Sequence, residues 1–585
     1  MATHQVFNVP APWAGVNVFS NDRALAAAVA TAGATADEVG RLATLGDLAG
    51  SPEAQDWGRL ANSYPPVLRS HDRYGHRVDE VEFHPSWHQL MSVAVGNGLH
   101  AAPWADPSPH AHLVRAAGFY VWSQVEQGHA CPVSMTYAVL PALRHNPELA
   151  AEFEPGLTSR DYDFGLRPSG SKRGLLAGMA MTEKQGGSDV RANTTEARLN
   201  RDGSYSITGH KWFCSAPMCD LFLVLAQTGA GLSCFAVPRV LPDGSRNPFA
   251  LQRLKDKLGN RSNASSEVEF EATIGRLVGT EGRGVRTILE MVTMTRLDCV
   301  IGSAAVQRAA LTQAMHHIDG REAFGARLSA QPLMQEVVAD LAVEVAAASA
   351  LFLRLASAVD SDEAPLLRLA VAASKYWVCK RTATVVAEAL ECLGGAGYVE
   401  ESPLPRYFRE SPLNSIWEGS GNVIALDVVR AACREPESVQ ALQDELALSA
   451  GADPRLDAAV DDLGRRLAAL GADREADARG ARELAGLLAR TLQASLLVRA
   501  ADSAVGVAGS QGVAGARGVA GAVDGAVGSV AGGSAVAEAF LASRLAPAGP
   551  GTFGTHAGAG SAARRVAVDA VLGYCDPNRA AAARA

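Results

Sequence analysis

Asn414-Ser-Ile-Trp-Glu-Gly-Ser-Gly-Asn422 places a glutamate, Glu418, between a tryptophan and a glycine. The apolar pattern VIALDVVRAA follows at once and predicts a helix, whose N-terminal amides can serve an anion or a cofactor. An aromatic neighbour in a desolvated pocket raises the pKa of a glutamate, as a base for a weakly acidic C–H bond requires. Taken alone, a helix-capping or surface glutamate is an equally good interpretation.

Helical patterns surround this segment. The stretches ALTQAMHHIDGREAF and LMQEVVADLAVEVAAASALFLRLASAV lie between Arg283 and Arg434. Their apolar stripes are too wide for a single exposed face, so we predict core helices of a bundle. From about Asp22 to Ala150 the pattern is again mostly helical, with predicted loops at Ser63–Asp79 and Ala102–His110.

The region beyond Glu435 is expected to be a helical extension, with runs at Leu456–Leu470 and Arg482–Ala500. A Gly/Ala/Val/Ser tract follows from Ala504 to Ala535 and repeats motifs such as GVAGA. Because small side chains bury little area, we expect this tract to be a flexible insertion, with any final helix starting near Val536.

Between the helical regions, short apolar runs and period-two stretches predict strands of an antiparallel barrel or sandwich. These strands are expected at Ser204–Phe213, Leu221–Gln227, Leu232–Pro238 and Ser266–Thr273. The predicted fold is therefore α+β and mainly α. Its four domains are an N-terminal helical domain (1–170), a middle antiparallel β domain (171–280), a helical bundle (281–434) and the C-terminal extension (435–585).

Size and composition agree with this division. A chain of 585 residues is too long for one hydrophobic core, and two to four domains are expected. The net charge of -9 argues against a globally basic protein that coats nucleic acid. Nine cysteines are scattered singly, without zinc-site spacing, and the N-terminus lacks a signal-peptide pattern, so we predict a cytoplasmic protein without a metal site.

Two further segments have the chemistry of a cofactor site. In Met181-Thr-Glu-Lys-Gln-Gly-Gly-Ser-Asp-Val190, paired glycines let the backbone approach a ligand, and Thr182 and Ser188 offer hydroxyls and amides to flavin ring edges and phosphates. About 25 residues later, Gly209-His-Lys-Trp-Phe-Cys-Ser215 combines an aromatic strand with polar groups. Alone, the first is more often a surface turn and the second a core strand.

Together, these segments resemble the motifs of the acyl-CoA dehydrogenase superfamily, in the family's order. Further matches are Lys257–Ser265, Arg296 before Gly302, Arg321-x-x-Phe324-Gly325 and Leu393-Gly-Gly-Ala-Gly-Tyr398. Lys184-Gln185, Gly421-Asn422, the N-terminal Val6-Phe-Asn-x-Pro10 and the long C-terminal region resemble the AidB-type alkylation-response branch.

The resemblance implies bound FAD and a homotetramer, in which Arg321 and the glycine-rich segment reach the flavin of a neighbouring subunit. Phe213 would lie against the isoalloxazine and Ser215 near flavin N5. Gln331-Pro332 and Glu391 depart from the family pattern and put two of the contacts in question. The implied cofactor residues are Met181, Thr182, Gly187, Ser188, Phe213, Cys214, Ser215, Arg321, Phe324, Gly394, Gly395, Trp417, Gly419, Ser420 and Asn422, with Arg296 at the substrate.

Glu418 is implied to be the catalytic base, since the family's other base position is Thr295 here, which cannot serve. It would take the α-proton of a short or branched acyl-CoA while a β-hydride passes to the flavin, from which an electron acceptor is then reduced. The alternative is a flavoprotein of the alkylation response that binds double-stranded DNA.

The arginines beyond residue 434 bear on that alternative. They are slightly outnumbered by acidic residues, and Lys380 is the last lysine of the chain. The arginines can form one basic face, but a solvated, salt-bridged surface is the favoured interpretation. They are Arg465, Arg466, Arg474, Arg479, Arg482, Arg490 and Arg499.

Overall fold

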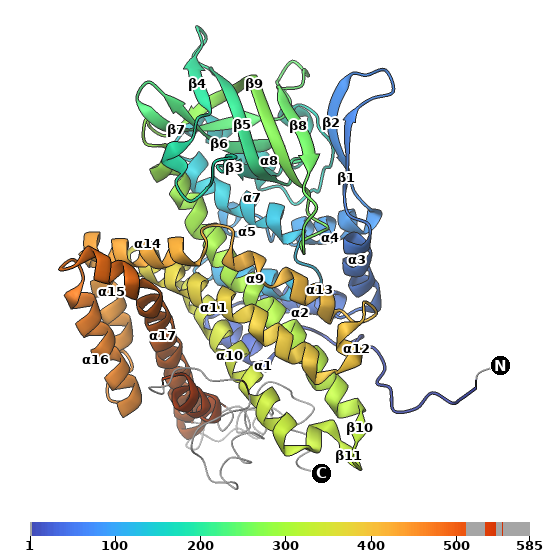
Figure 1. Cartoon of the computed structure of the whole chain (residues 1–585), viewed down its shortest axis with the longest axis vertical. Coiled ribbons are helices and arrows are strands. Elements are labelled where there is room, and N and C mark those ends of the chain that lie inside the picture. Colours follow the sequence, from blue (N-terminus) through green and yellow to red (C-terminus); the bar gives the residue numbers. More distant parts are fainter. Residues whose placement is uncertain (1–2, 511–532, 546–552, 554–585) are drawn as a thin grey trace. The chain divides into compact units, whose positions relative to one another are not determined.

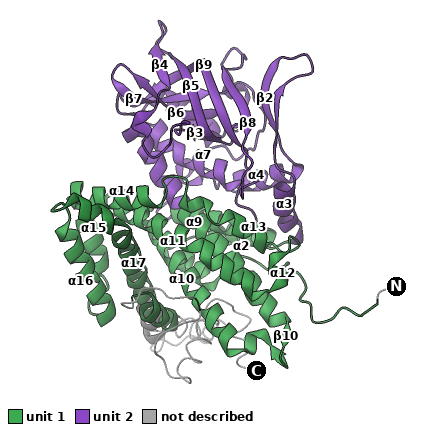
Figure 2. Ribbon diagram, in the orientation of Figure 1, with its two compact units in different colours: residues 1–51, 112–124, 299–585 green, residues 52–111, 125–298 purple. Residues whose placement is uncertain are grey.

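The computed structural model describes residues 3–510, 533–545 and 553 (Figure 1). Contacts divide the chain into two compact units, coloured separately in Figure 2. Unit 1 contains residues 1–51, 112–124 and 299–585, and unit 2 contains residues 52–111 and 125–298. Because the chain passes repeatedly between the units, this division differs from the four predicted domains, which remain predictions. The last passage lies inside helix α9 (Gly284–Gly320).

Unit 2 contains a seven-stranded sheet (Figure 1). Its order is β3-β6-β4-β5-β9-β7, and an additional pairing of β6 with β7 closes a ring, while β8 pairs with β9. The strands at all four predicted positions are confirmed. The strands are β3 (Ala177–Ala180), β4 (Glu196–Leu199), β5 (Tyr205–Ser215), β6 (Leu221–Thr228), β7 (Gly231–Pro238), β8 (Phe249–Leu254) and β9 (Ser265–Val278).

Most of the pairings are antiparallel, as predicted, and β6 pairs antiparallel with β7, but one edge of β6 departs from this pattern. This strand pairs parallel with β3, from Ala177 opposite Leu221 to Ala180 opposite Val224, and touches β4 in parallel at one residue pair. Parallel neighbours need a long crossover connection, and residues 181–220, including β4 and β5, provide it. The segment predicted to hold a cofactor therefore begins where β3 ends.

The predicted loop at Ser63–Asp79 is also wrong in part, because a β-hairpin lies there. Strands β1 (Val67–His71) and β2 (Arg77–Glu82) pair antiparallel, and the Asp72 carboxylate accepts the amides of Tyr74 and His76 in the turn. The other elements of unit 2 are the helices α3 (Pro52–Ser63), α4 (Pro85–Gly96), α5 (Ala102–Ala105), α7 (Ala130–Leu143) and α8 (Pro147–Leu157).

Unit 1 is a helical bundle around α10 (Pro332–Asp360) and α11 (Ala364–Cys392). Both helices are buried over most of their length, as their wide apolar stripes predicted. The surrounding helices are α1 (Arg23–Thr31), α2 (Ala36–Ala49), α6 (Ala111–Ser123), α12 (Gly395–Tyr398), α13 (Leu404–Glu410), α14 (Gly421–Arg434), α15 (Pro436–Ala447), α16 (Pro454–Ala469) and α17 (Arg474–Ser510).

The helical pattern predicted through Phe324 ends earlier than expected. Helix α9 stops at Gly320, and β10 (Glu322–Ala323) and β11 (Ala326–Arg327) form a short hairpin. Phe324 and Gly325 form its turn with φ of 54° and 79°. Two consecutive residues with positive φ are typical of the tight turns that join antiparallel strands, and no helix can continue through them.

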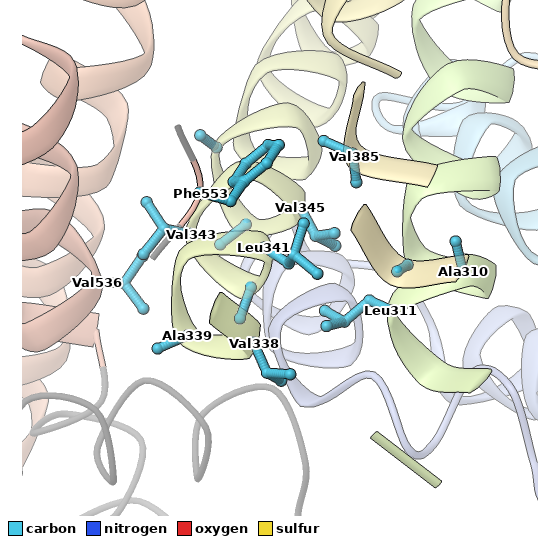
Figure 3. Close-up of a cluster of buried hydrophobic side chains, with 14 of the residues drawn as sticks. Ala310, Leu311, Val338, Ala339, Leu341, Val343, Val345, Val385, Val536 and Phe553 are labelled. Atoms are coloured by element: carbon cyan, nitrogen blue, oxygen red, sulfur yellow. The ribbon is translucent and has the colours of Figure 1, made fainter. Parts of the chain in front are cut away.

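The C-terminal residues that the structure describes pack into the core of unit 1. Residues 504–510 continue α17, which contradicts the flexible tract predicted there, while residues 511–532 lie outside the described residues. A further helix covers residues 533–544. Its Val536 and the later Phe553 join the buried cluster around Val338 and Leu341 (Figure 3).

Helix α17 has an additional property. Among the described residues, its segment Arg474–Ala501 alone is long and apolar enough to cross a membrane. The structure buries 78% of its most apolar window, which is typical of a core helix.

Candidate functional site

The first group of predicted cofactor residues lies in unit 2, in the loop that follows β3. The Met181 carbonyl accepts a hydrogen bond from Asn193 Nδ2 (2.9 Å), and the Thr182 carbonyl accepts one from the Trp212 amide (2.8 Å). A Cβ at Gly187 would lie 2.3 Å from Thr182 Oγ1, so this position requires glycine. The start of the loop is thus fixed to the barrel, while Gly187 and Ser188 are exposed.

A buried ion pair joins this loop to β5. Lys211 Nζ lies 2.8 Å from Glu183 Oε1, and both side chains are fully buried. The Glu183 carboxylate also accepts the amides of Thr194 (2.7 Å) and Thr195 (3.1 Å). Burial acts to raise the pKa of the Glu183 carboxyl, but the hydrogen bonds from Lys211 and the amides outweigh it and hold that pKa well below its usual range.

The sequence interpretation gave neither Glu183 nor Lys211 a role. Both residues lie inside the two predicted cofactor segments, Glu183 in 181–190 and Lys211 in 209–215. Sequence spacing alone did not indicate that the Glu of one motif and the Lys of the other meet in the barrel.

The aromatic strand is distorted where Phe213 lies. The register of β5 against β9 shifts between Lys211 and Cys214, which is the signature of a β-bulge. Phe213 is 53% exposed, unusually for a large aromatic ring, and Lys255 Nζ lies 4.4 Å from its centroid. The exposed part of the ring, away from Lys255, can receive a flat ligand.

The two residues after Phe213 differ in what they can offer. Cys214 is buried, and burial raises the pKa of its thiol to about 12, so its backbone is the part available to a cofactor. Ser215 is half-buried at the end of β5.

The Lys257–Ser265 segment is anchored by a buried carboxylate. Glu126 accepts hydrogen bonds from Ser262 Oγ (2.7 Å), Asn62 Nδ2 (2.8 Å) and the amides of Gly128 and His129. Burial alone would raise its pKa, yet the hydrogen bonds from His129 and Ser262 lower it to about 2. In the structure, the Ser262 hydrogen bond to Glu126 fixes this segment within unit 2.

The second group of predicted residues lies in unit 1, at the start of α14. Glu418 has a φ of 57°, which non-glycine residues rarely adopt, and Gly419 follows with a φ of 103°. Trp417 Nε1 donates to Asn414 Oδ1 (2.9 Å), and Asn414 Nδ2 donates to Ser303 Oγ on α9 (3.0 Å). The tryptophan and asparagine thus tie the turn to a long helix.

The N-terminus of α14 has no side-chain cap. Ser420 occupies the N-cap position without a side-chain hydrogen bond to the helix. The first amides of a helix carry partial positive charge and attract anions. Ser420 and Asn422 are both exposed there, so this helix end can receive a negatively charged group.

A lysine that the sequence interpretation passed over lies beside the turn. Lys375 on α11 is buried, and its Nζ lies 2.6 Å from the Trp417 carbonyl and 2.5 Å from the Gly419 carbonyl. Lys375 stands within a strongly apolar helix, and nothing in its local pattern distinguishes it from a surface lysine.

The remaining predicted residues of unit 1 are near its surface. Arg321 donates to the Asn8 carbonyl (2.9 Å), so the N-terminal segment already uses part of its guanidinium. Phe324 is 97% exposed and Tyr398 is 80% exposed. Gly394, with a φ of 59°, and Gly395 lead into α12. These segments therefore present exposed aromatic side chains.

The helix predicted to support the substrate is α9. Arg296 is half-buried on it in unit 2, and the neighbouring Thr295 is buried with its hydroxyl bonded to the Val292 carbonyl (3.1 Å). The Thr295 hydroxyl is thus bonded to the backbone of its own helix, α9.

A cavity of 630 Å³ in unit 2 does not coincide with these groups. The hairpin and the barrel line it, with Arg77, Asp79 and Arg239 among its walls. It includes none of the residues predicted to hold FAD. The predicted residues, rather than this cavity, therefore define the candidate site. Within the described parts of the chain, no group of three metal-ligating side chains is found.

Comparisons with known proteins cover most of the chain. The model of the "Adaptive response protein AidB N-terminal domain" matches residues 8–164. The middle and C-terminal domains of acyl-CoA dehydrogenase match residues 178–273 and 282–433. The Escherichia coli (strain K12) protein named "Putative acyl-CoA dehydrogenase AidB" is 49% identical over 471 residues, which are 80% of this chain and 87% of that protein.

Solved structures agree with this result. Caenorhabditis elegans ACDH-11, in complex with C11-CoA, superposes with a TM-score of 0.78 at 26% identity, covering 85% of this chain and 90% of that one. An acyl-CoA dehydrogenase from Bacillus anthracis, complexed with FAD, has a TM-score of 0.63 at 18% identity and covers 84% and 82% of the two chains. At that identity the second structure supports the fold alone.

Proposed function

The chain belongs to the acyl-CoA dehydrogenase family and, within it, to the AidB group, and we propose that it is an FAD-dependent enzyme that dehydrogenates an acyl-CoA thioester. The α+β, mainly helical fold with a middle β domain is that of the family. We further propose a short or branched acyl chain as the substrate. Because the ACDH-11 structure contains C11-CoA, an eleven-carbon acyl-CoA is the longer substrate against which the short ones should be compared.

The observation that carries this proposal is the turn at Glu418. A carboxylate stands on a strained left-handed residue, between an anchored tryptophan and an uncapped helix end. Strain of this kind persists where the surrounding structure maintains it and is concentrated at functional sites. In the proposed reaction Glu418 removes the α-proton of the thioester as a general base.

The residues present fit FAD. In unit 2, the exposed Gly187 and Ser188 offer backbone amides and a hydroxyl, and the exposed part of the Phe213 ring offers a stacking surface. In unit 1, the uncapped start of α14 offers an anion site. When bound, FAD supplies the acceptor for the hydride that leaves the β-carbon. Thr182, Ser188 and Ser215 would orient it, and Trp417 would help to exclude water from Glu418.

We also propose a homotetramer in which Arg321, Phe324, Gly394 and Gly395 complete the flavin site of a neighbouring copy. The exposure of Phe324 and Tyr398 supports an interface at these segments. An electron acceptor must then reoxidise the flavin, and we propose that the enzyme works in the cytoplasm.

A second candidate is a role in the adaptive response to DNA alkylation, with little dehydrogenase activity and with binding to double-stranded DNA. The name of the N-terminal family model favours it. Four of the seven arginines named in the sequence argue against it, because they are paired with carboxylates: Arg465, Arg466, Arg479 and Arg499. Arg482 and Arg490 instead contact Tyr376 and Trp377.

The test is the absorbance spectrum of the purified protein during anaerobic addition of isovaleryl-CoA, other short acyl-CoAs and an eleven-carbon acyl-CoA. We expect a bound flavin that one of these thioesters bleaches in the wild type and that Glu418→Gln leaves oxidised. A bound flavin that no thioester reduces would favour the second candidate.

A further inference from the structure

The backbone at Glu418 needs an explanation that its own sequence does not supply. Glu418 and Gly419 are consecutive residues with positive φ. Gly419 adopts this conformation freely, but the Cβ of Glu418 clashes there with its own backbone. Something in the fold must therefore stabilise the turn.

Lys375 contacts this turn at two points. Its ammonium donates to the Trp417 carbonyl (2.6 Å) and to the Gly419 carbonyl (2.5 Å), which belong to the peptide planes before Glu418 and after Gly419. The two left-handed residues are therefore held between two fixed planes. Lys375 itself is carried by the 29-residue helix α11, whose core position makes it a rigid support.

The partners of Lys375 are unusual for a buried lysine. Buried charges are ordinarily paired with an opposite charge, because an isolated ammonium is costly to remove from water. Among the described residues, Lys375 makes no ion pair, and both of its hydrogen bonds go to these carbonyls. By contrast, the buried Lys172 and Lys211 each meet a carboxylate.

We infer that Lys375 is a positioning residue for the proposed dehydrogenase reaction: its ammonium holds the Glu418-Gly419 pair in the left-handed conformation and so fixes where the Glu418 carboxylate points. Charge-assisted hydrogen bonds are stronger than neutral ones and suit this task. Because both hydrogen bonds of the lysine go to the backbone, it acts on the position of Glu418 through the peptide chain. This inference rests on the proposed function only for its kinetic part.

The experiment uses the full-length, FAD-loaded protein with Lys375→Met, which keeps an unbranched side chain one atom shorter and removes the ammonium. The first readout is amide hydrogen exchange of the peptide that covers residues 414–422. We expect faster exchange in this peptide and little change in peptides of unit 2. The second readout is the rate of anaerobic flavin reduction as a function of acyl-CoA concentration.

A displaced base slows the chemical step more than it weakens binding. We expect the reduction rate at saturating acyl-CoA to fall by roughly 10- to 100-fold, with the half-saturating concentration changed less than about threefold. Lys375→Arg keeps the charge and the donors, so it should lose less rate than Lys375→Met. If Lys375→Met does not fold, Lys375→Arg supplies both readouts against the wild type, and intermediate losses are expected.

Lys172→Met is the matched control, because Lys172 has a buried side chain of the same type that pairs with Asp220 (2.5 Å). It should lower Tm and leave the rate per bound flavin unchanged. Unchanged exchange at residues 414–422 in Lys375→Met would overturn the inference, as would a rate loss that Lys172→Met shares. If no thioester reduces the wild-type flavin, the proposed function fails, and the exchange readout still decides whether Lys375 holds the turn.

Discussion

Two glutamates in two predicted motifs, one in each unit, have a buried lysine beside them and are treated in opposite ways. In unit 2, Lys211 binds the carboxylate of Glu183, which also accepts backbone amides. In unit 1, Lys375 binds the carbonyls that flank Glu418. The hydrogen bonds that hold the barrel loop therefore use the Glu183 carboxylate itself. At Glu418, the lysine holds the backbone on either side of the residue.

The difference separates a structural carboxylate, Glu183, from the proposed catalytic base, Glu418. A carboxylate whose oxygens are occupied by cation and amide donors has a depressed pKa and cannot take a proton from a weak acid. A carboxylate on a backbone held by other groups can keep a pKa suited to its reaction. The motif alone does not distinguish the two, because each is a glutamate in a segment that also contains glycines.

The largest expected effect is therefore at Glu418. Glu418→Gln keeps the size of the side chain and removes the base, so flavin reduction by an acyl-CoA should slow by roughly 10²- to 10⁴-fold. Stopped-flow absorbance under anaerobic conditions measures this rate. If the flavin of the Glu418→Gln variant were reduced at a rate within about threefold of the wild type, Glu418 would not be the base and the contrast with Glu183 would fail.

The next largest effect is on stability, at Glu183. Glu183→Gln leaves the Lys211 ammonium buried without its ion-pair partner, which should lower the free energy of unfolding by about 3–5 kcal/mol. Urea denaturation of the FAD-loaded protein measures the change.

The matched variant is the double substitution Glu183→Gln with Lys211→Met. It removes the stranded charge and should recover part of the loss. The rate per bound flavin should stay within about threefold of the wild type. A rate loss as large as that of Glu418→Gln would mean that Glu183 also takes part in the chemistry.

Sequence patterns predicted the elements that carry these residues better than the contacts between them. The period-two pattern located β5, and the apolar pattern after Glu418 located α14. The Lys375 contact was not predictable, since α11 is apolar around most of its surface and its lysine meets a turn far along the chain. Pairing partners, such as β3 with β6, are likewise absent from local periodicity.

A third glutamate, Glu126, extends the comparison to pH. Hydrogen bonds from His129 and Ser262 outweigh burial and lower its pKa from 4.5 to about 2. The depressed pKa contributes stability that is fully present above the unfolded value near 4.5 and is lost as pH falls toward 2. The loss should amount to about 3 kcal/mol, at 1.36 kcal/mol for each pH unit.

The measurement is the free energy of unfolding of wild type and Glu126→Gln between pH 6 and the acid transition. The variant should be less stable at pH 6 and should depend less on pH below about 4.5. Parallel curves for the two proteins would place Glu126 outside the class of anchoring carboxylates that Glu183 represents.

The smallest effects are expected where the pairing is exposed. Arg465 and Arg479 meet Asp462 and Glu475 on the surfaces of α16 and α17, with most of their side chains in solvent. Arg479→Ala should change the free energy of unfolding by less than about 0.5 kcal/mol, because solvent and salt screen such pairs.

The same residues test the second candidate function. If the protein binds double-stranded DNA at all, replacing Arg465, Arg466 and Arg479 together by alanine should leave the affinity within about twofold, since their carboxylate partners already neutralise them. Gel-shift titrations at several salt concentrations measure both affinity and its salt slope. If these arginines contacted phosphates, the slope would fall by about three and the affinity would drop for every sequence alike. The surface ion pairs would then open when DNA binds, and these arginines would differ in this respect from Lys211, whose ion pair with Glu183 is buried.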